Sequence, residues 1–283
     1  MTISPHLIDE FGPDSELFNP EAFAASLKGG AIIPAIRAAL NAGQSVLEAR
    51  FDRRENIKDI VRRRAWLIDQ VAKGLWVHFG FDSNDGIALI GVGGYGRGEL
   101  HPHSDVDLLI LLSEDSAAAD SEQISKFVTL LWDIGLDIGH SVRTVQECAD
   151  EARNDITIAS NLMEARLITG SKALFGAMMD ATGPDKMWSD KAFFKAKWHE
   201  QIVRHHKHNN TEYNLEPDIK NAPGGLRDIQ MIGWVAKRHF GATRLSDLVT
   251  HGFLTQNEYD ILNAGQSFLW ELRWALHQLT RRG

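Results

Sequence analysis

The sequence predicts an α+β fold, in which a small mixed sheet with flanking helices is followed by a helical domain. Two short apolar runs, residues 87–92 and 106–112, are bounded by glycine or polar residues, as is typical of buried strands. Longer stretches on either side repeat apolar residues at the spacing of amphipathic helices. We therefore expect an N-terminal arm with helices over 1–80, a core holding the site over 81–150, and a helical domain packed on that core over 151–283.

The remaining elements follow from periodicity and end signals. A third strand is expected at 136–142, in a sheet with its helices on one side. Thr144 and Thr255 are each followed three residues later by glutamate, which has the form of a helix capping box. In chain order, the predicted helices are 21–50, 55–79, 122–133, 145–153, 155–168, 171–181, 190–212, one that begins near Leu226, and 258–280.

Composition and charge exclude several classes of protein. No apolar run approaches the roughly 20 residues of a membrane span, and the first 20 residues do not resemble a signal peptide. The net charge of −8 argues against a partner made of long nucleic acid. The single cysteine, Cys148, cannot form an internal disulfide, which fits a reducing compartment. We expect a cytoplasmic protein with neither a membrane nor a nucleic-acid partner.

Two aspartates at the start of the second apolar run are the first candidates for chemistry. Asp105 and Asp107 are two residues apart, so on a strand their side chains project from the same face. Two carboxylates this close repel each other unless a proton or cation lies between them. Mg²⁺ prefers oxygen ligands and usually takes one or two carboxylates together with substrate phosphates. The alternative is a hairpin with two exposed aspartates.

The glycines between the two strands supply a second half of the same site. Gly93, Gly94, Gly96 and Gly98 allow positive φ and close approach of the backbone to a ligand. Successive N–H groups in such a turn can form a nest for an anion such as phosphate. A phosphate cradle followed by paired aspartates indicates metal-dependent nucleotidyl transfer, with a nucleoside triphosphate as donor.

These residues also carry a resemblance. Gly93-Gly94 followed by Asp105-Val106-Asp107 resembles the signature of the DNA polymerase β-like nucleotidyltransferase superfamily, so that the predicted core is a nucleotidyltransferase core. The longer string GGYGRGELHPHSDVDLL is similar to the bacterial family that uridylylates the PII nitrogen-signalling protein. The resemblance implies UTP as donor, a PII tyrosine hydroxyl as acceptor, and Mg²⁺ or Mn²⁺ as cofactor.

The resemblance also implies roles for single residues. It makes Asp137 a third acidic residue beside Asp105 and Asp107, with a catalytic and metal-binding role. The position of Asp137 between Leu136 and Ile138 suggests a buried carboxylate on a strand. The alternative is an exposed aspartate on an edge strand. Ser104 and Arg97 become candidate nucleotide contacts alongside Gly93 and Gly94. His101 and His103 could touch the triphosphate or simply make the loop polar.

A second stretch, residues 213–230, interrupts the helices with YNLEPDIKNAPGGLRDIQ. Gly224 and Gly225 precede a helix N-terminus, which is a ready anion site, and Lys220 and Arg227 add positive charge, so both are candidate nucleotide contacts. The alternative is an ordinary helix–helix connection. This stretch, continuing through 234–241, also resembles the PII-uridylylating family.

Other features carry weaker hypotheses. His205 and His208 lack the further ligands that zinc needs, and the basic residues 62–64 are interpreted as a solvated helix face. Within the superfamily, another acceptor such as glutamine synthetase or a small molecule is an alternative, and a non-catalytic nucleotide-sensing module is another. None of the 12 histidines precedes an aspartate, and the last helix has no clear end signal. We expect a truncated chain that lacks the family's hydrolase and sensor domains, and that attaches UMP without removing it.

Overall fold

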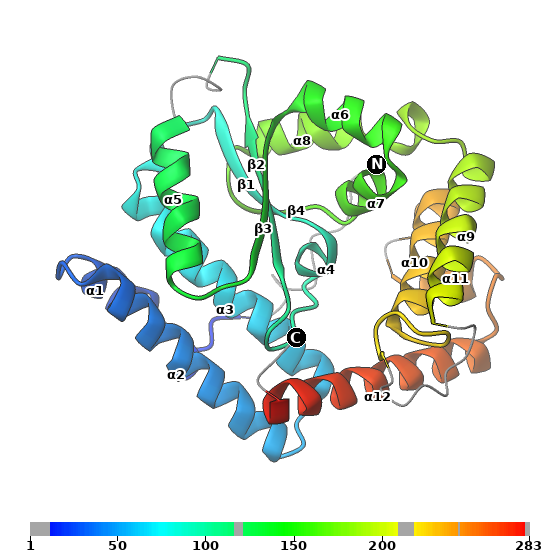
Figure 1. Ribbon diagram of the computed structural model, residues 1–283, viewed down its shortest axis with the longest axis horizontal. Helices are drawn as coiled ribbons and strands as arrows, with labels where there is room; N and C mark the ends of the chain where they lie inside the picture. Colours follow the sequence, from blue (N-terminus) through cyan, green and yellow to red (C-terminus); the bar gives the residue numbers. More distant parts are fainter. Residues whose placement is uncertain (1–11, 116–120, 209–217, 243, 281–283) are drawn as a thin grey trace.

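A four-stranded mixed sheet forms the centre of the protein in the computed structural model, which describes residues 12–115, 121–208, 218–242 and 244–280 (Figure 1). Its strand order is β3-β2-β1-β4, with β1 antiparallel to both β2 and β4, and β2 parallel to β3. The predicted α+β class is confirmed. The strands are β1 Ile87–Gly91, β2 Val106–Leu112, β3 Ile138–Thr144 and β4 Arg166–Gly170.

Helices cover both faces of the sheet, not one face as predicted (Figure 1). Alternate residues of β2 point to opposite faces, so that Leu108 and Ile110 pack with the first group of helices and Leu109 and Leu111 with the second. Because β1 and β2 are apolar on both sides, each face needs its own cover. The first group is α3 Ile57–His78 and α5 Ser121–Asp133; the second is α6 Val145–Asn154, α7 Ile156–Met163 and α8 Lys172–Ala181.

Strand β4 was not predicted, because we expected a helix over 155–168. The helix ends at Met163, and Arg166–Gly170 then pairs with β1 across a register shift between Leu89 and Ile90. A five-residue edge strand is too short for its alternation to stand out beside a strong helical signal. The third strand was also predicted two residues early, since Gly135, with φ of +89°, and the two residues after it form the turn from α5.

The N-terminal helices pack against the sheet through α3, and they lie at the lower left of Figure 1. The single helix predicted over 21–50 is two helices, α1 Pro20–Leu27 and α2 Ile32–Asp52, which are separated around Gly29 and Gly30. Short 3-10 turns follow at η1 Phe81–Ser83 and later at η2 Pro184–Lys186.

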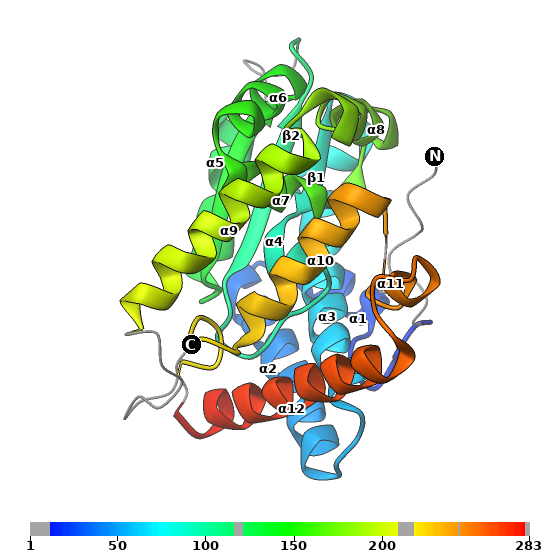
Figure 2. The same cartoon turned by 90° about the vertical axis from the view of Figure 1, so that its right-hand side faces the viewer.

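The C-terminal helices form a layer beside the sheet, with α9 and α10 side by side and α12 passing beneath them (Figure 2). Trp270 and Trp274 of α12 are buried in the same hydrophobic core as α3. Both predicted capping boxes form, at Thr144 with Glu147 and at Thr255 with Glu258. Three parts of these predictions lie outside the described residues: the end of the predicted helix at 209–212, the start of the predicted loop at 213–217, and the last three residues, 281–283. The bounds are α9 Asp190–Lys207, α10 Leu226–Phe240, α11 Asp247–Thr250 and α12 Gln256–Thr280.

Among the described residues, no helix combines the length and the apolar character that a membrane span requires.

Candidate active site

Asp107 is the second residue of β2, and Asp105 lies immediately before that strand. Asp107 is half-buried and shares a face with Leu109, while Asp105, one residue before the strand, is exposed. Burial raises the pKa of Asp107, and the charge of Asp105 raises it further, whereas Lys220 and Arg227 lower it. A bound cation would relieve the repulsion between these two carboxylates.

Asp137 comes to the same end of the sheet from the neighbouring strand. Its carbonyl accepts a hydrogen bond of 2.8 Å from the Val106 N–H, and the parallel register that pairs Asp107 with Gly139 sets Asp137 opposite Asp105. By alternation Asp137 belongs to the face of the other two aspartates. Its side chain is exposed and precedes β3, so the prediction of a buried strand carboxylate was wrong.

The donor set fits a hard divalent cation. In the described residues, no group of three or more His, Cys, Asp or Glu side chains is arranged to hold a metal by itself. A Mg²⁺ site, however, usually takes only one or two carboxylates from the protein, and phosphate oxygens of the substrate complete it. Gly139 leaves room for them: a Cβ there would lie 2.5 Å from Oδ1 of Asp107.

The glycine turn is a short helix, α4 Gly93–Gly96, that begins beside Asp107. Gly93 has φ of +57°, and a Cβ on it would lie 3.2 Å from Oδ2 of Asp107. The Val92 N–H donates to the Asp107 carbonyl at 3.0 Å, which ties the turn to β2. No described residue accepts a hydrogen bond from the N–H of Gly93 or Gly94. Gly93 therefore lies next to the Asp107 carboxylate, and the N–H donors of Gly93 and Gly94 are available.

A buried polar network fixes α4 from behind. The Tyr95 hydroxyl donates to Oδ1 of Asp69 on α3 at 2.6 Å. The guanidinium of Arg166 on β4 donates to both oxygens of the same carboxylate, at 2.6 and 3.0 Å. It also donates to the Gly96 carbonyl at 3.2 Å. Asp69 and Arg166 are almost completely buried, so their pairing joins α3, α4 and β4.

Arg97 and Ser104, two predicted nucleotide contacts, are engaged inside the protein. Arg97 lies between Glu99, at 2.8 Å, and the buried Glu164, at 2.5 Å. Burial is the largest single influence on the pKa of Arg97 and lowers it. The two carboxylates together outweigh burial, so the pKa lies above its ordinary value. Ser104 accepts a hydrogen bond of 3.2 Å from Arg273. Arg97 is still close enough for its charge to lower the pKa of Asp107.

Lys220 enters the site from the loop before α10, and Arg227 from the first turn of that helix. Lys220 is half-buried and its charge acts on both Asp105 and Asp107; burial lowers its own pKa, as do the charges of Arg273 and Arg227. Arg227 stacks on Trp234, with 5.4 Å between guanidinium carbon and ring centroid. The loop thus carries positive charge to the paired aspartates.

The backbone of that loop does not offer the predicted anion site. The Gly224 N–H donates to Asp228 at 2.8 Å and the Gly225 N–H to the Ala222 carbonyl at 2.9 Å. The Leu226 N–H is also used, by the Ile219 carbonyl at 3.0 Å. Because these donors are satisfied internally, only the side chains of this loop can bind a phosphate.

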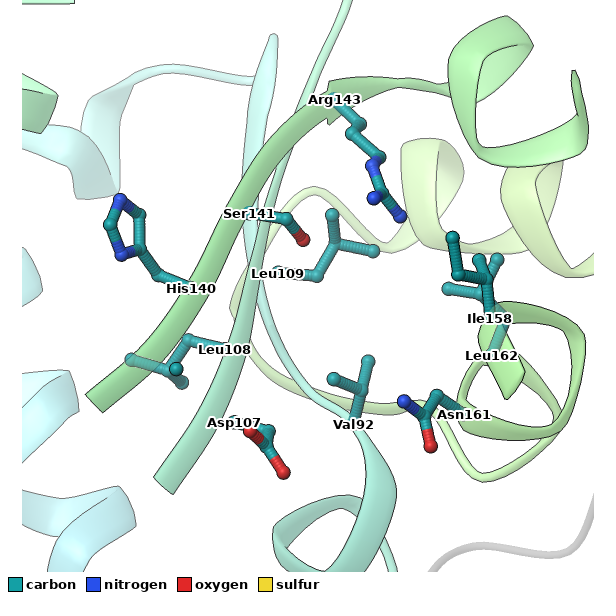
Figure 3. Close-up of a pocket in the computed structure, with 11 residues that line it drawn as sticks. Val92, Asp107, Leu108, Leu109, His140, Ser141, Arg143, Ile158, Asn161 and Leu162 are labelled. Carbon is teal, nitrogen blue, oxygen red and sulfur yellow. The ribbon is translucent and has the colours of Figure 1, made fainter. Parts of the chain in front are cut away.

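Three residues in the site were missed by sequence reasoning. Ser141, Arg143 and Asn161 line a cavity of about 250 Å³ together with Asp107 and Gly139 (Figure 3). Ser141 and Arg143 follow Gly139 at two-residue spacing on β3, hence on the Asp107 face. Figure 3 shows Asn161 of α7 and the Arg143 side chain on either side of this space. The signal for Ser141 and Arg143 was the alternation along β3, which has meaning only once the register with β2 is known, and Asn161 enters through the packing of α7.

The histidines have structural roles among the described residues. His101 is buried against Trp270 and Trp274. His205 contacts both oxygens of Asp228 at 3.0 Å and so joins α9 to α10. No zinc set forms around His205 or His208 in the described part of the chain.

Comparison with known proteins identifies two matching regions. The nucleotidyltransferase domain family matches residues 78–158, and the family described as GlnD PII-uridylyltransferase matches residues 192–283. The first match contains the glycine turn and all three aspartates; the second contains Lys220 and Arg227.

Curated relatives are similar along nearly the whole chain. Bifunctional uridylyltransferase/uridylyl-removing enzymes of Stutzerimonas stutzeri (strain A1501), Pseudomonas putida (strain W619) and Azotobacter vinelandii (strain DJ) are 50%, 49% and 48% identical to it. Each similarity extends over 270 residues, which is 95% of this chain and 30% of the relative. The chain thus spans about a third of the length of these relatives.

Proposed function

We propose that this chain transfers UMP from UTP to a tyrosine hydroxyl of a PII protein. The premise is that it belongs to the bifunctional uridylyltransferase/uridylyl-removing enzyme family and contains its nucleotidyltransferase domain. The observation that carries the proposal is the meeting of the Gly93–Gly94 amides with Asp107 at the end of the sheet. Donor, acceptor and metal are inferred from family membership and from the chemistry of this site.

The binding step follows from the charges of the site. The N–H groups of Gly93 and Gly94 would donate to oxygens of the triphosphate. Lys220 would add a full positive charge to the same phosphates, since its charge already reaches both Asp105 and Asp107. Arg143 lines the cavity from β3 together with Asp107 and would supply a second cation there.

Transfer requires neutralisation of the charge that develops on the phosphates. Asp105 and Asp107 would hold Mg²⁺ or Mn²⁺, with Asp137 on the exposed side of the pair. When bound, such an ion stabilises the leaving pyrophosphate and lowers the pKa of the attacking hydroxyl. Asn161 and Ser141 would orient the donor by hydrogen bonds, because they line the cavity beside Asp107. The remaining contribution is positioning of the acceptor in line with the phosphate.

A titration of the 283-residue chain with each of the four nucleoside triphosphates, in the presence of Mg²⁺, tests the donor. We expect UTP to bind most tightly, and binding to weaken by about tenfold or more when Lys220 is changed to Gln. The acceptor is tested by incubating the chain with UTP and a PII protein and measuring the mass of PII. Equal affinity for all four nucleotides, or an unmodified PII tyrosine, would contradict the proposal.

A further inference from the structure

A second cavity, of about 430 Å³, lies among α3, α4, α10 and α12. Small-molecule pockets usually measure roughly 300 to 1,000 Å³. None of Asp105, Asp107, Lys220 and Arg227 lines this space, so it is separate from the candidate active site. It borders that site through Gly96, the last residue of the glycine turn, through Arg97, and through Trp234, on which Arg227 stacks.

The lining of this cavity carries an excess of positive charge. Five cationic residues line it against two carboxylates, although the whole chain has a net charge of −8. Both carboxylates, Glu99 and Glu164, are already paired with Arg97. Among the described residues no carboxylate is within ion-pair distance of Arg62. The other four cationic residues are Lys58, Arg97, Lys237 and Arg244.

Lys58 and Arg62 form the core of this excess. They are four residues apart on α3 and therefore share a helix face. Both are half-buried, and Lys58 donates to the side-chain oxygen of Asn263 on α12. Burial lowers the pKa of Lys58 and the charge of Arg62 lowers it further, whereas the charge of Glu99 raises it. Two cations held together in a partly dry space are destabilised until an anion joins them.

The other walls offer hydrogen bonds and flat apolar surface. Tyr259, Asn263 and Gln266 recur along one face of α12, and Trp270 follows one turn later. Gln230 faces them from α10. Convergent polar groups on an aromatic wall are typical of a pocket for a small organic molecule. The basic residues 62–64 are therefore not one solvated face, since Arg62 lines the cavity and Arg64 is bonded to the His101 carbonyl at 3.1 Å.

We propose that this cavity binds a small anionic metabolite, with a carboxylate or phosphate group between Lys58 and Arg62 and its polar body against α12. The site is distinct from the one proposed for UTP and does not depend on that proposal. Its position against Arg97 would place the ligand directly behind the glycine turn.

Calorimetric titration of the full chain with citrate, and separately with inorganic phosphate at matched ionic strength, tests the site. We expect saturable binding of at least one of these anions, and the tighter of the two identifies the class of anionic group. Arg62→Gln should weaken that binding by about tenfold. Arg53→Gln, which removes an exposed charge paired with Glu55, should leave it unchanged. Gln266→Glu, which adds a negative charge to the cavity without removing a cation, should weaken binding as well.

Two further measurements separate this site from the nucleotide site. Citrate or phosphate should protect Lys58 from acetylation, as read by peptide mass spectrometry, and binding should persist in Lys220→Gln. Absence of saturable binding, or binding that is lost in Lys220→Gln and kept in both Arg62→Gln and Gln266→Glu, would overturn the inference. Failure of UTP binding with intact citrate or phosphate binding would contradict only the proposed function.

Discussion

Asp107 is the side chain on which the electrostatics of the site converge. Its carboxylate is half-buried, Asp105 carries the same charge beside it, and Gly93 and Gly139 lie against its two oxygens. Burial and Asp105 together raise its pKa, so the ionised form destabilises the folded chain as long as no cation is bound. Residues that serve a site in this way commonly reduce stability.

We expect Asp107→Asn to lower nucleotidyl transfer by at least about a hundredfold, because it removes a carboxylate that we propose as a ligand of the catalytic cation. The same change should stabilise the metal-free chain at pH 7. A carboxyl with a raised folded pKa opposes folding at high pH, and this effect vanishes as the pH falls below its ordinary pKa of 3.8. Thermal unfolding in EDTA should therefore show a gain that shrinks from pH 7 to pH 4.

The control for this change is Asp82→Asn, on an exposed residue, which should alter neither transfer nor its dependence on metal. A destabilised Asp107→Asn chain at pH 7, or one with near-normal transfer, would show that the carboxylate has a structural role.

Gly139 offers a test of the metal geometry without loss of a carboxylate. In Gly139→Ala the new Cβ would lie 2.5 Å from Oδ1 of Asp107, so the carboxylate must rotate away. We expect UTP binding in Mg²⁺ to weaken by about tenfold or more, with the fold retained. Gly265→Ala is the matched control, since a Cβ there meets no atom within 4 Å and alanine favours the α12 helix. Equal UTP affinity in both variants would remove Gly139 from the site.

At the scale of elements, the sequence predicted those strands, helices and caps that are determined by residues within a single segment. Strands β1 and β2, helices α3 and α5, and both capping boxes follow from apolar spacing and end residues within one segment. Strand β4 did not follow, because its stability comes from pairing with β1, almost 80 residues earlier. Likewise Asp105, Asp107 and the glycines could be found by spacing, whereas Arg143 and Asn161 reach the site only through the register of β2 with β3 and the docking of α7.

The element that presents the glycine amides is too short to hold itself. Helix α4 has four residues and no side-chain cap, so its position depends on Asp69 and Arg166 through Tyr95 and Gly96. A buried pair of this kind is costly to break, since one partner is left as an uncompensated charge.

We expect Tyr95→Phe to destabilise the chain by about 1–2 kcal/mol, because Asp69 loses a buried hydrogen-bond donor. If the network positions α4, the affinity for UTP should fall as well, although the Tyr95 hydroxyl is bonded to Asp69 on α3 and not to Asp105 or Asp107. Denaturant unfolding and a UTP titration measure the two effects separately. A loss of stability with unchanged UTP affinity would assign Tyr95 to the core alone.

At the scale of the whole molecule, α12 closes the structure. Trp270 and Trp274 enter the core that also contains α1 to α3 and one face of the sheet. His277 of the same helix is buried and hydrogen-bonded to the Pro102 carbonyl in the loop between α4 and β2. The N-terminal helices, the sheet and α12 therefore share one core, and α12 reaches the loop that leads to Asp105.

This contact makes the stability of the chain depend on pH. Burial lowers the pKa of His277 from 6.5 to about 4, with further lowering by the charge of Arg273. A histidine whose folded pKa is depressed stabilises the fold above its ordinary pKa, and this contribution is lost as the pH falls from about 6.5 toward 4. We expect the urea midpoint to fall over that interval, and His277→Gln to flatten the fall. His199→Gln, on an exposed ring, should leave the slope unchanged; an identical slope in His277→Gln would contradict the assignment.

The Asp69–Arg166 pair also has a consequence for the order of events during synthesis. The two residues are 97 positions apart, with the glycine turn, the three aspartates and strands β2 and β3 between them. While the chain is being made, α3 and β1 emerge first, but Asp69 has no counter-ion until residue 166 has left the ribosome. The glycine turn therefore acquires its shape only after every acidic residue of the candidate site has been translated, and a ribosome-bound intermediate that ends before β4 should not bind nucleotide.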